Sequence, residues 1–315
     1  TPLYSSAASD VYKRQVHEGV LTKEEESAYW GRGERPSPDT LVPVRNGLGW
    51  EGYLEASTLR PLFKSPKEAS SLWVDVKNLN RVFLPPSGNW ERLPPHARAY
   101  VKYGEEVPLE ARKGRHRGQA LRGVPSLSTV RGRNPWWWLG DWPDADVVLP
   151  MFERARKYAF WNPGHAAIDA ALYLVLPRTG TKPLNLLLAL NTTLFALFKE
   201  ILARPPEGGG GGPLQVKVYQ YESMLIPHPS LFSGLGKADL ESFLTRPIRD
   251  FWDEVGLTPP DFADPPSPLP DRKALDKLAF DAIGLTPEER DEVYLETARL
   301  VWGRIAQARS LSGTE

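Results

Sequence analysis

The sequence predicts an α/β or α+β domain followed by a C-terminal helical segment. Apolar runs of strand length at residues 147–149 and 172–176 each end at a proline. They alternate with segments of helical periodicity, whereas the last third of the chain carries helix start and stop signals instead. We therefore expect the domain at residues 41–235 and the helical region at 236–315. Residues 1–40 are expected to be a non-native or disordered tail and linker.

The remaining elements of the domain follow from local patterns. Residues 59–65 should close a helix, because Pro61 cannot continue one. Residues 72–76 and 214–219 are expected to be strands, and 94–103 a helix. The apolar stretch 184–202 is expected to form one buried helix. Five glycines at 208–212 should form a loop before the strand at 214.

The helical region is defined by its capping residues. Residues 240–255 are expected to be helical, and Asp271 should open a helix that ends at Gly284. Thr286 and Glu289 have the spacing of a capping box, with Pro287 at the first helical position. The faces expected to be buried comprise Leu275, Leu278 and Ile283 on the first helix, and Val293, Thr297, Leu300, Val301, Ile305 and Ala308 on the second.

Charge is distributed unevenly along the chain. The 315 residues have a formal net charge of zero, and 41% of them are hydrophobic, enough for a sizeable core. Residues 98–157 contain twelve Arg or Lys against seven Asp or Glu, a balance of +5, whereas residues 239–315 contain nine against sixteen, a balance of −7. A basic middle and an acidic end indicate a polyanion-facing surface on the first only.

Composition also excludes several classes of site. The chain has no cysteine, so disulfides, thiolate metal sites and a cysteine nucleophile are excluded. Its five histidines include no pair at metal-ligand spacing, which argues against a zinc site. Polar residues interrupt the stretch at 184–202, so it falls short of a membrane span, and no secretory signal opens the sequence. We expect a cytoplasmic protein without a membrane partner.

A basic and aromatic stretch at residues 112–162 is the most informative feature. Residues 112–133 contain seven Arg or Lys and no Asp or Glu, three consecutive tryptophans follow, and a second group of cations starts at Arg154. Cations follow a phosphate backbone, while flat rings and guanidinium planes reach base faces and edges. The candidate DNA-binding residues are Arg112, Lys113, Arg115, Arg117, Arg131, Arg133, Trp136, Trp137, Trp138, Arg154, Arg156, Lys157 and Asn162.

These residues are expected to make two kinds of contact with DNA. Arg131 and Arg133 are candidates for base-edge contacts, because arginine bonds guanine bidentately. The group at 154–157, expected on a strand, should hold phosphates. We expect both basic segments to lie on one face and form a single groove. At least one of the three tryptophans should be exposed, since alternate residues of an extended segment point to opposite faces.

Three motifs offer catalytic alternatives. Residues 47–52 match the glycine pattern of a dinucleotide loop, although a turn-rich hairpin is the simpler interpretation. Residues 134–137, Asn-Pro-Trp-Trp, resemble the [DNS]PP[YFW] motif with which amino-methyltransferases hold a flipped base, with Trp136 in place of the second proline. Asp75 and Lys77, with Asp39 upstream, have the outline of a metal-dependent nuclease. None of these motifs is a complete catalytic site.

Taken in order, segments across most of residues 41–310 resemble the C-terminal specificity region of adenine-specific DNA methyltransferases, including the fused methylase–restriction enzymes of Type II systems. Each segment is individually weak, but their order and spacing are fairly specific. The matching segments are 58–65, 99–105, 133–138, 147–150, Asn162, 187–194, 208–216, 271–276, 283–285 and 304–310.

The resemblance implies a target-recognition domain that reads double-stranded DNA. It also implies that an upstream methyltransferase domain of the same polypeptide, using S-adenosylmethionine, methylates a flipped adenine. No cofactor is expected in this chain itself. Residues 5–15 are similar to the translated adapter-like tails of assembled environmental contigs, so we expect the native start to be missing. A self-contained enzyme and a scaffold that does not bind DNA remain the alternatives.

Overall fold

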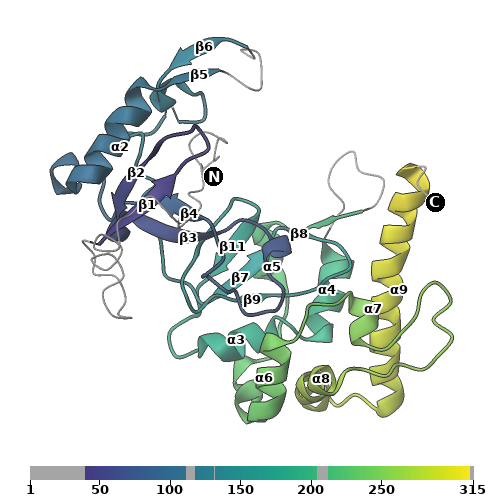
Figure 1. Cartoon of the computed structure of the whole chain (residues 1–315). Coiled ribbons are helices and arrows are strands. Elements are labelled where there is room, and N and C mark those ends of the chain that lie inside the picture. The colour runs from purple at the N-terminus through teal and green to yellow at the C-terminus, as the bar shows by residue number, and fades with distance from the viewer. Residues whose placement is uncertain (1–39, 111–117, 131, 204–211, 313–315) are drawn as a thin grey trace, which may run out of the picture. The chain divides into compact units, whose positions relative to one another are not determined.

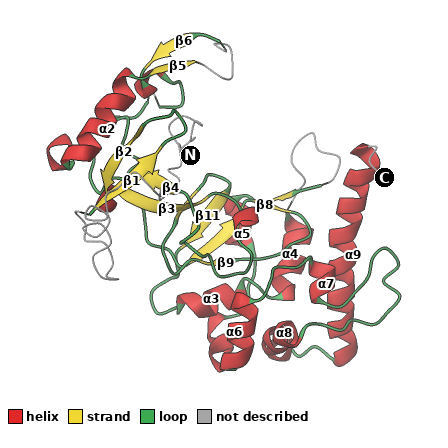
Figure 2. Ribbon diagram, in the orientation of Figure 1, coloured by secondary structure: helices red, strands yellow, loops and turns green. Residues whose placement is uncertain are grey.

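The computed structural model describes residues 40–110, 118–130, 132–203 and 212–312. It is a mixed α/β structure with several small sheets and a C-terminal helical segment (Figures 1 and 2). The chain divides into two compact units: residues 1–63 with 76–144, which we call unit 1, and residues 64–75 with 145–315, which we call unit 2. The predicted residues 41–235 thus contribute to both units.

Unit 1 places short antiparallel strands beside one helix. Its elements are β1 (Leu41–Arg45), β2 (Glu51–Glu55), β3 (Leu59–Phe63), β4 (Arg81–Phe83), α2 (Pro95–Glu106), β5 (Pro108–Glu110) and β6 (Ala120–Arg122). The pairs are β1 with β2, β3 with β4, and β5 with β6. Residues 59–63 are therefore a strand and the helix expected there is wrong, because Pro61 lies in the ladder opposite Arg81.

Helix α2 is held at its N-terminus by a carboxylate from β2. Pro94 precedes the helix and provides no capping side chain. The buried Glu55 accepts hydrogen bonds from the backbone N–H groups of His96 at 2.9 Å and Ala97 at 3.0 Å. A negative charge at this end complements the helix dipole. This contact fixes α2, predicted from the sequence, against the β1–β2 hairpin.

Unit 2 surrounds a small antiparallel sheet with helices. The strands are β7 (Val147–Pro150), β8 (Phe152–Glu153), β9 (Phe160–Trp161), β10 (Ala167–Ile168), β11 (Leu172–Val175) and β12 (Leu214–Gln215); β7 lies between β11 and β9, and β12 pairs with β8. The helices are α3 (Pro183–Ala189), α4 (Thr193–Leu202), α5 (Val218–Ser223), α6 (Lys237–Thr245), α7 (Phe251–Glu254), α8 (Pro270–Ile283) and α9 (Pro287–Ser312). The strands predicted at 147–149 and 172–176 are confirmed.

Several predicted elements are shorter than expected. The segment 72–76 forms only an isolated bridge, between Trp73 and Trp161, and the strand predicted at 214–219 ends at Gln215 and is followed by α5. The single helix expected at 184–202 is broken at Asn191. Its side chain binds the backbone of Ala159 and the carbonyl of Leu187, and Thr192 caps the new helix through the N–H of Phe195. The polar interruptions of this stretch thus mark a helix boundary.

The C-terminal helices form as their caps predict. Gly284 ends α8 with φ of 74°, in the left-handed region that glycine favours. Thr286 and Glu289 exchange the two bonds of a capping box at 2.8 and 3.3 Å. The buried face of α8 differs from the prediction, because Arg272, Leu275 and Asp276 are buried whereas Ile283 is exposed. Asp276 binds the N–H and hydroxyl of Thr193 at 2.7 and 2.6 Å, which joins α8 to α4.

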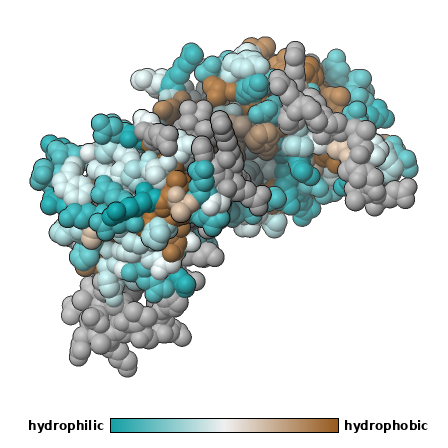
Figure 3. All heavy atoms as spheres, turned by 90° about the horizontal axis from the view of Figure 1, so that it is seen from above, coloured by the Kyte–Doolittle hydropathy of each residue, from teal (hydrophilic) through white to brown (hydrophobic). Residues whose placement is uncertain are grey.

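Most apolar side chains of the described residues are packed inside the two units. On the face drawn in Figure 3, hydrophobic residues form small groups within a mostly hydrophilic surface. Among the described residues, no single helix is long and apolar enough to cross a membrane. The pair α3 and α4 meets the length and composition criteria only when taken together, and it is bent by 62°.

Candidate nucleic-acid interface

The two basic segments lie in different units. Arg133 belongs to unit 1, whereas Arg154, Arg156 and Lys157 belong to unit 2. That the two basic segments form a single groove therefore stays a prediction. The candidates Arg112, Lys113, Arg115, Arg117 and Arg131 lie outside the described residues.

The three tryptophans pack against α2 rather than projecting from a strand. Trp137 is 7% exposed and contacts the cluster of Leu93, Ala97 and Val101, while Trp136 and Trp138 are half-buried beside it. The segment is a turn, so the alternation expected of an extended chain does not apply. Trp137 in the core agrees with the expectation that some of the three are buried. Trp136 and Trp138 keep part of their surface exposed, which is less than the expected exposed member.

Two of these indole rings rest directly on glycines. A β-carbon on Gly104 of α2 would lie 2.5 Å from Cη2 of Trp136, and one on Gly88 would lie 2.8 Å from Trp138. The indole N–H of Trp136 also lies 3.3 Å from Oε1 of Glu105. The ring of Trp136 can occupy this position because residue 104 is a glycine and has no side chain.

Replacing Gly104 with Ala should lower the free energy of unfolding by about 1–3 kcal/mol, because the new methyl group overpacks against Trp136. Alanine's helix preference alone would stabilise by about 1 kcal/mol. Gly303→Ala in α9 is the control, since nothing lies within 4 Å of its added β-carbon, and it should be neutral or stabilising. Urea unfolding of both variants checks the prediction. If the Gly104 and Gly303 variants were stabilised equally, the close packing of Trp136 against Gly104 would be contradicted.

Arg133 lines a narrow recess beside these rings. The recess has a volume of about 40 Å³ and is also bordered by Asn46, Tyr100, Tyr103 and Trp136. That space holds a few water molecules and is far too small for a nucleobase. Arg133 is half-buried, and its backbone N–H is bonded to Val130. A base contact by Arg133 would therefore have to be made by its guanidinium outside the recess.

The second basic group lies on a loop rather than the expected strand. Residues 154–159 connect β8 to β9, and both Arg154 and Arg156 are exposed. The Nε atom of Arg156 lies 3.7 Å from Oδ1 of Asp250. The side chain of Arg154 has no ion-pair partner in the part of the chain that the structure describes, and only its carbonyl is bonded, to Arg304. Both guanidinium groups are positioned to meet an anion.

Lys157 does not share this position, and its assignment to phosphate binding is wrong. Its side chain is 1% exposed, with Nζ 3.1 Å from Oε2 of Glu153 and 2.5 Å from Oε1 of Glu200. Lys199 binds Glu153 at 2.7 Å, and Arg304 binds Glu200 at 2.9 Å. Burial raises the pKa of Glu200, but its pairs with Lys157 and Arg304 outweigh burial and lower it overall. Lys157 thus joins the loop to α4.

Asn162 is also structural. It is fully buried; its amide nitrogen donates to the carbonyls of Ala145 and Ala166 at 3.0 and 3.1 Å, and its oxygen accepts from the N–H of Ala166 at 2.9 Å. These bonds hold the turn after β9. Because this side chain is buried and bonded to the protein's own backbone, Asn162 lies in the core and not on a surface that DNA could contact.

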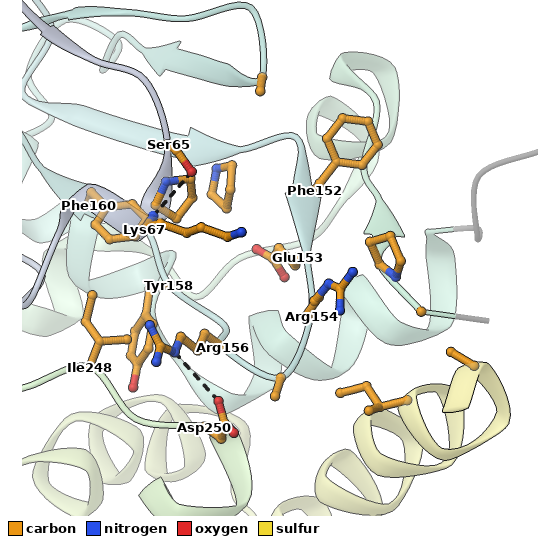
Figure 4. Close-up of a pocket in the computed structure, with 18 of the residues that line it drawn as sticks. Ser65, Lys67, Phe152, Glu153, Arg154, Arg156, Tyr158, Phe160, Ile248 and Asp250 are labelled. Atoms are coloured by element: carbon orange, nitrogen blue, oxygen red, sulfur yellow. Dashed lines mark hydrogen bonds and ion pairs between the residues drawn. The ribbon is translucent and has the colours of Figure 1, made fainter. Parts of the chain in front are cut away.

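The exposed arginines border a large cavity in unit 2. Its volume is about 940 Å³, and its walls come from the segment 65–67, the β8–β9 loop, the segment before α7, and α9. Figure 4 shows Lys67, Arg154 and Arg156 around the same opening, with Phe160 and Ile248 on one side of it. Arg309 of α9 also lines it, 5.4 Å from the ring of Trp302. We call Lys67, Arg154 and Arg156 the rim cations.

The carboxylates that line this cavity are already compensated. Glu153 is bound by Lys157 and Lys199, and Asp250 faces Arg156. The cavity therefore presents excess positive charge. Sequence reasoning missed Lys67, because it stands next to Glu68 and outside any run of cations. The one local signal is Ser65-Pro66, which starts a short 3₁₀ turn whose Ser65 hydroxyl accepts from the N–H of Lys67 at 3.3 Å.

Comparison with known proteins gives a match among solved structures. No protein-family model matches the chain, and no curated protein does. Among solved structures, the chain is similar to the type IIG restriction endonuclease BpuSI, with a TM-score of 0.50 and 14% identity. The two share a fold. The match covers 97% of this chain and 31% of that one, so this chain spans about a third of the length of the structure it matches.

The catalytic alternatives gain no support from the geometry. Residues 47–50 lie in the turn of the antiparallel β1–β2 hairpin, and Glu51 and Gly52 begin β2, which does not fit a dinucleotide or methyl-donor loop between a strand and a helix. In residues 134–137, the ring expected to stack on a flipped base is Trp137, which is buried in the core.

The nuclease outline is not supported either. The strand expected to carry Asp75 and Lys77 forms only an isolated bridge at Trp73, and Asp39 lies outside the described residues. No group of three His, Asp or Glu side chains that could hold a metal occurs among residues 40–110, 118–130, 132–203 and 212–312.

Proposed function

We propose that this chain recognises double-stranded DNA as the specificity part of an adenine-specific DNA methyltransferase of a restriction–modification system. Methyl transfer, with S-adenosylmethionine as donor, is assigned to a linked domain of the same polypeptide. The observation that carries the proposal is the set of rim cations around one cavity, which offers phosphate ligands from two separate segments. The fold shared with part of a type IIG restriction endonuclease supports it.

The structure suggests how phosphate and base contacts divide. Arg154 and Arg156 are exposed on a loop anchored by the buried Glu153, Lys157 and Glu200, so an anchored backbone presents exposed cations to phosphates. Such contacts position a protein on DNA but carry no sequence information. Arg133, in unit 1, remains our candidate for base readout. Trp136 and Trp138 are only half-buried and remain candidates for contacts beside it.

Selection of binding sites from a random duplex pool tests the proposal. The purified chain should retain duplexes that share a short sequence, and it should not bind labelled S-adenosylmethionine by itself. Recovery of no common sequence would contradict a specificity role. Binding of S-adenosylmethionine would instead favour a self-contained methyltransferase.

Arg133→Ala should weaken binding to the selected site by about 1–3 kcal/mol and relax the sequence preference, because a bidentate guanine contact is lost. Arg122→Ala is the matched control, since Arg122 is exposed at the end of β6 and is not a candidate for base readout. Anisotropy titrations with cognate and mismatched duplexes make the comparison. An unchanged preference in the Arg133 variant would remove it from the base-reading residues.

Asp250→Asn should strengthen duplex binding and steepen its salt dependence by about 1, because it frees Arg156 from a competing carboxylate 3.7 Å away. Asp253→Asn makes the same change of charge at an exposed position in α7 and should have a smaller effect. Titrations between 50 and 200 mM salt would measure both. Equal behaviour of the two variants would show that Arg156 does not contact phosphate.

A further inference from the structure

The cavity of unit 2 is an open pocket that is larger than phosphate contacts require. Its volume of about 940 Å³ falls in the range of sites that enclose a small molecule. A duplex lying across the opening would touch the rim cations and leave the interior unused. Contacts with the DNA phosphate backbone alone therefore do not account for the interior of the cavity.

The interior is apolar where the rim is charged. Among its lining residues, Phe152 of β8 is 42% exposed and Ile248 and Ile305 are half-buried, whereas Phe160 and Trp252 are buried. Cations at the mouth with rings and aliphatic side chains behind them match the two halves of a nucleotide, an anionic phosphate and a flat base. The apolar wall can therefore pack against a base and shield it from water.

The polar groups of the inner wall are already engaged. The hydroxyl of Tyr158 donates to the carbonyl of Arg249 at 3.0 Å and accepts from the N–H of the same residue at 3.2 Å. Glu153 is bound by two lysines. Neither side chain is available to distinguish one base from another, so binding inside the cavity should depend weakly on base identity.

We propose that this cavity holds one unstacked nucleotide, with its phosphate on the rim cations and its base against the apolar wall. The proposal rests on the proposed DNA-binding function and extends it to a nucleotide displaced from the duplex. Unstacking costs free energy in a paired duplex, and that cost is absent when the nucleotide is already unpaired. A duplex with one unpaired nucleotide should therefore bind more tightly than a fully paired one.

Three duplexes of identical flanking sequence test the proposal on the whole chain: fully paired, with one unpaired nucleotide, and with one unpaired abasic residue. The abasic duplex is as flexible as the second but lacks the base. We expect the base-bearing duplex to bind about 10-fold more tightly than the abasic one, with little difference among the four bases. Equal affinities for these two duplexes would overturn the proposal.

Two further arms identify the source of the effect. Ala171 is half-buried in the cavity wall, and Ala171→Phe should fill the interior, removing the advantage of the base while leaving paired-duplex binding unchanged. Free deoxyadenosine monophosphate should reduce the extra affinity of the base-bearing duplex only if a single nucleotide suffices for binding. If paired DNA binds normally but the base adds nothing, this inference fails and the proposed function stands. If no duplex binds, the proposed function itself fails.

Discussion

Replacing Arg272 with Met should lower the free energy of unfolding by about 3–5 kcal/mol, because it removes a buried cation that shares the buried Glu254 with Arg246. The side chain of Arg272 is 1% exposed, with Nη2 3.2 Å from Oε2 of Glu254 and Nη1 bonded to the carbonyl of Asn191. It also lies over the ring of Phe243 at 5.1 Å. Burial lowers the pKa of Arg272, but Asp276 and Glu254 outweigh burial and raise it overall.

The consequence of this loss should spread beyond α8. Arg272 joins α8 to α7 and to the break between α3 and α4, so the helical segment and the sheet-bearing part of unit 2 depend on it together. Lys277→Ala is the control on the same helix, since its pair with Asp281 is exposed and should contribute less than about 1 kcal/mol. Denaturant unfolding measures both, and similar small losses would contradict the structural role of Arg272.

Replacing the three rim cations with Ala should reduce the slope of log K against log salt by about 2.7, at about 0.9 for each phosphate contact. Duplex affinity should fall for all sequences alike, because these residues contact phosphates. Lys67, Arg154 and Arg156 are exposed, so the fold should be retained. The measurement is anisotropy of a labelled duplex between 50 and 200 mM salt.

A second triple variant controls for net charge. Lys237, Lys273 and Arg299 are exposed cations of unit 2 that do not line the cavity. Their replacement with Ala removes the same three charges and should leave the slope nearly unchanged. If both triple variants lose affinity equally, general attraction accounts for binding and the cavity is not the phosphate site.

Local signals in the sequence predicted the elements that depend on local interactions. The caps at Gly284 and Thr286 act within a few residues, so α8 and α9 begin and end close to where the sequence indicates. The strands at β7 and β11 are short apolar runs with prolines at their ends, and they too were found. These elements required no knowledge of the rest of the fold.

Long-range contacts decided the elements and site residues that sequence reasoning missed. Pro61 ended a helix in the prediction but lies in a strand, because pairing with β4 outweighs the local pattern. Lys157 has the same charge as its neighbours Arg154 and Arg156, but its buried pairs with Glu153 and with Glu200, 43 residues away in sequence, make it part of the core. Lys67 belongs to the candidate site because the fold brings the segment 65–67 to the same cavity as the β8–β9 loop, which is distant in sequence.

The most direct test of the account is the salt dependence of duplex binding by the unmodified chain. Three rim cations on phosphates predict that log K falls with log salt with a slope of about −2.7 or steeper. The affinity for a selected duplex should also exceed that for a scrambled one at every salt concentration. Binding that is absent, or that does not change between 50 and 200 mM salt, would contradict the claim that this chain recognises DNA.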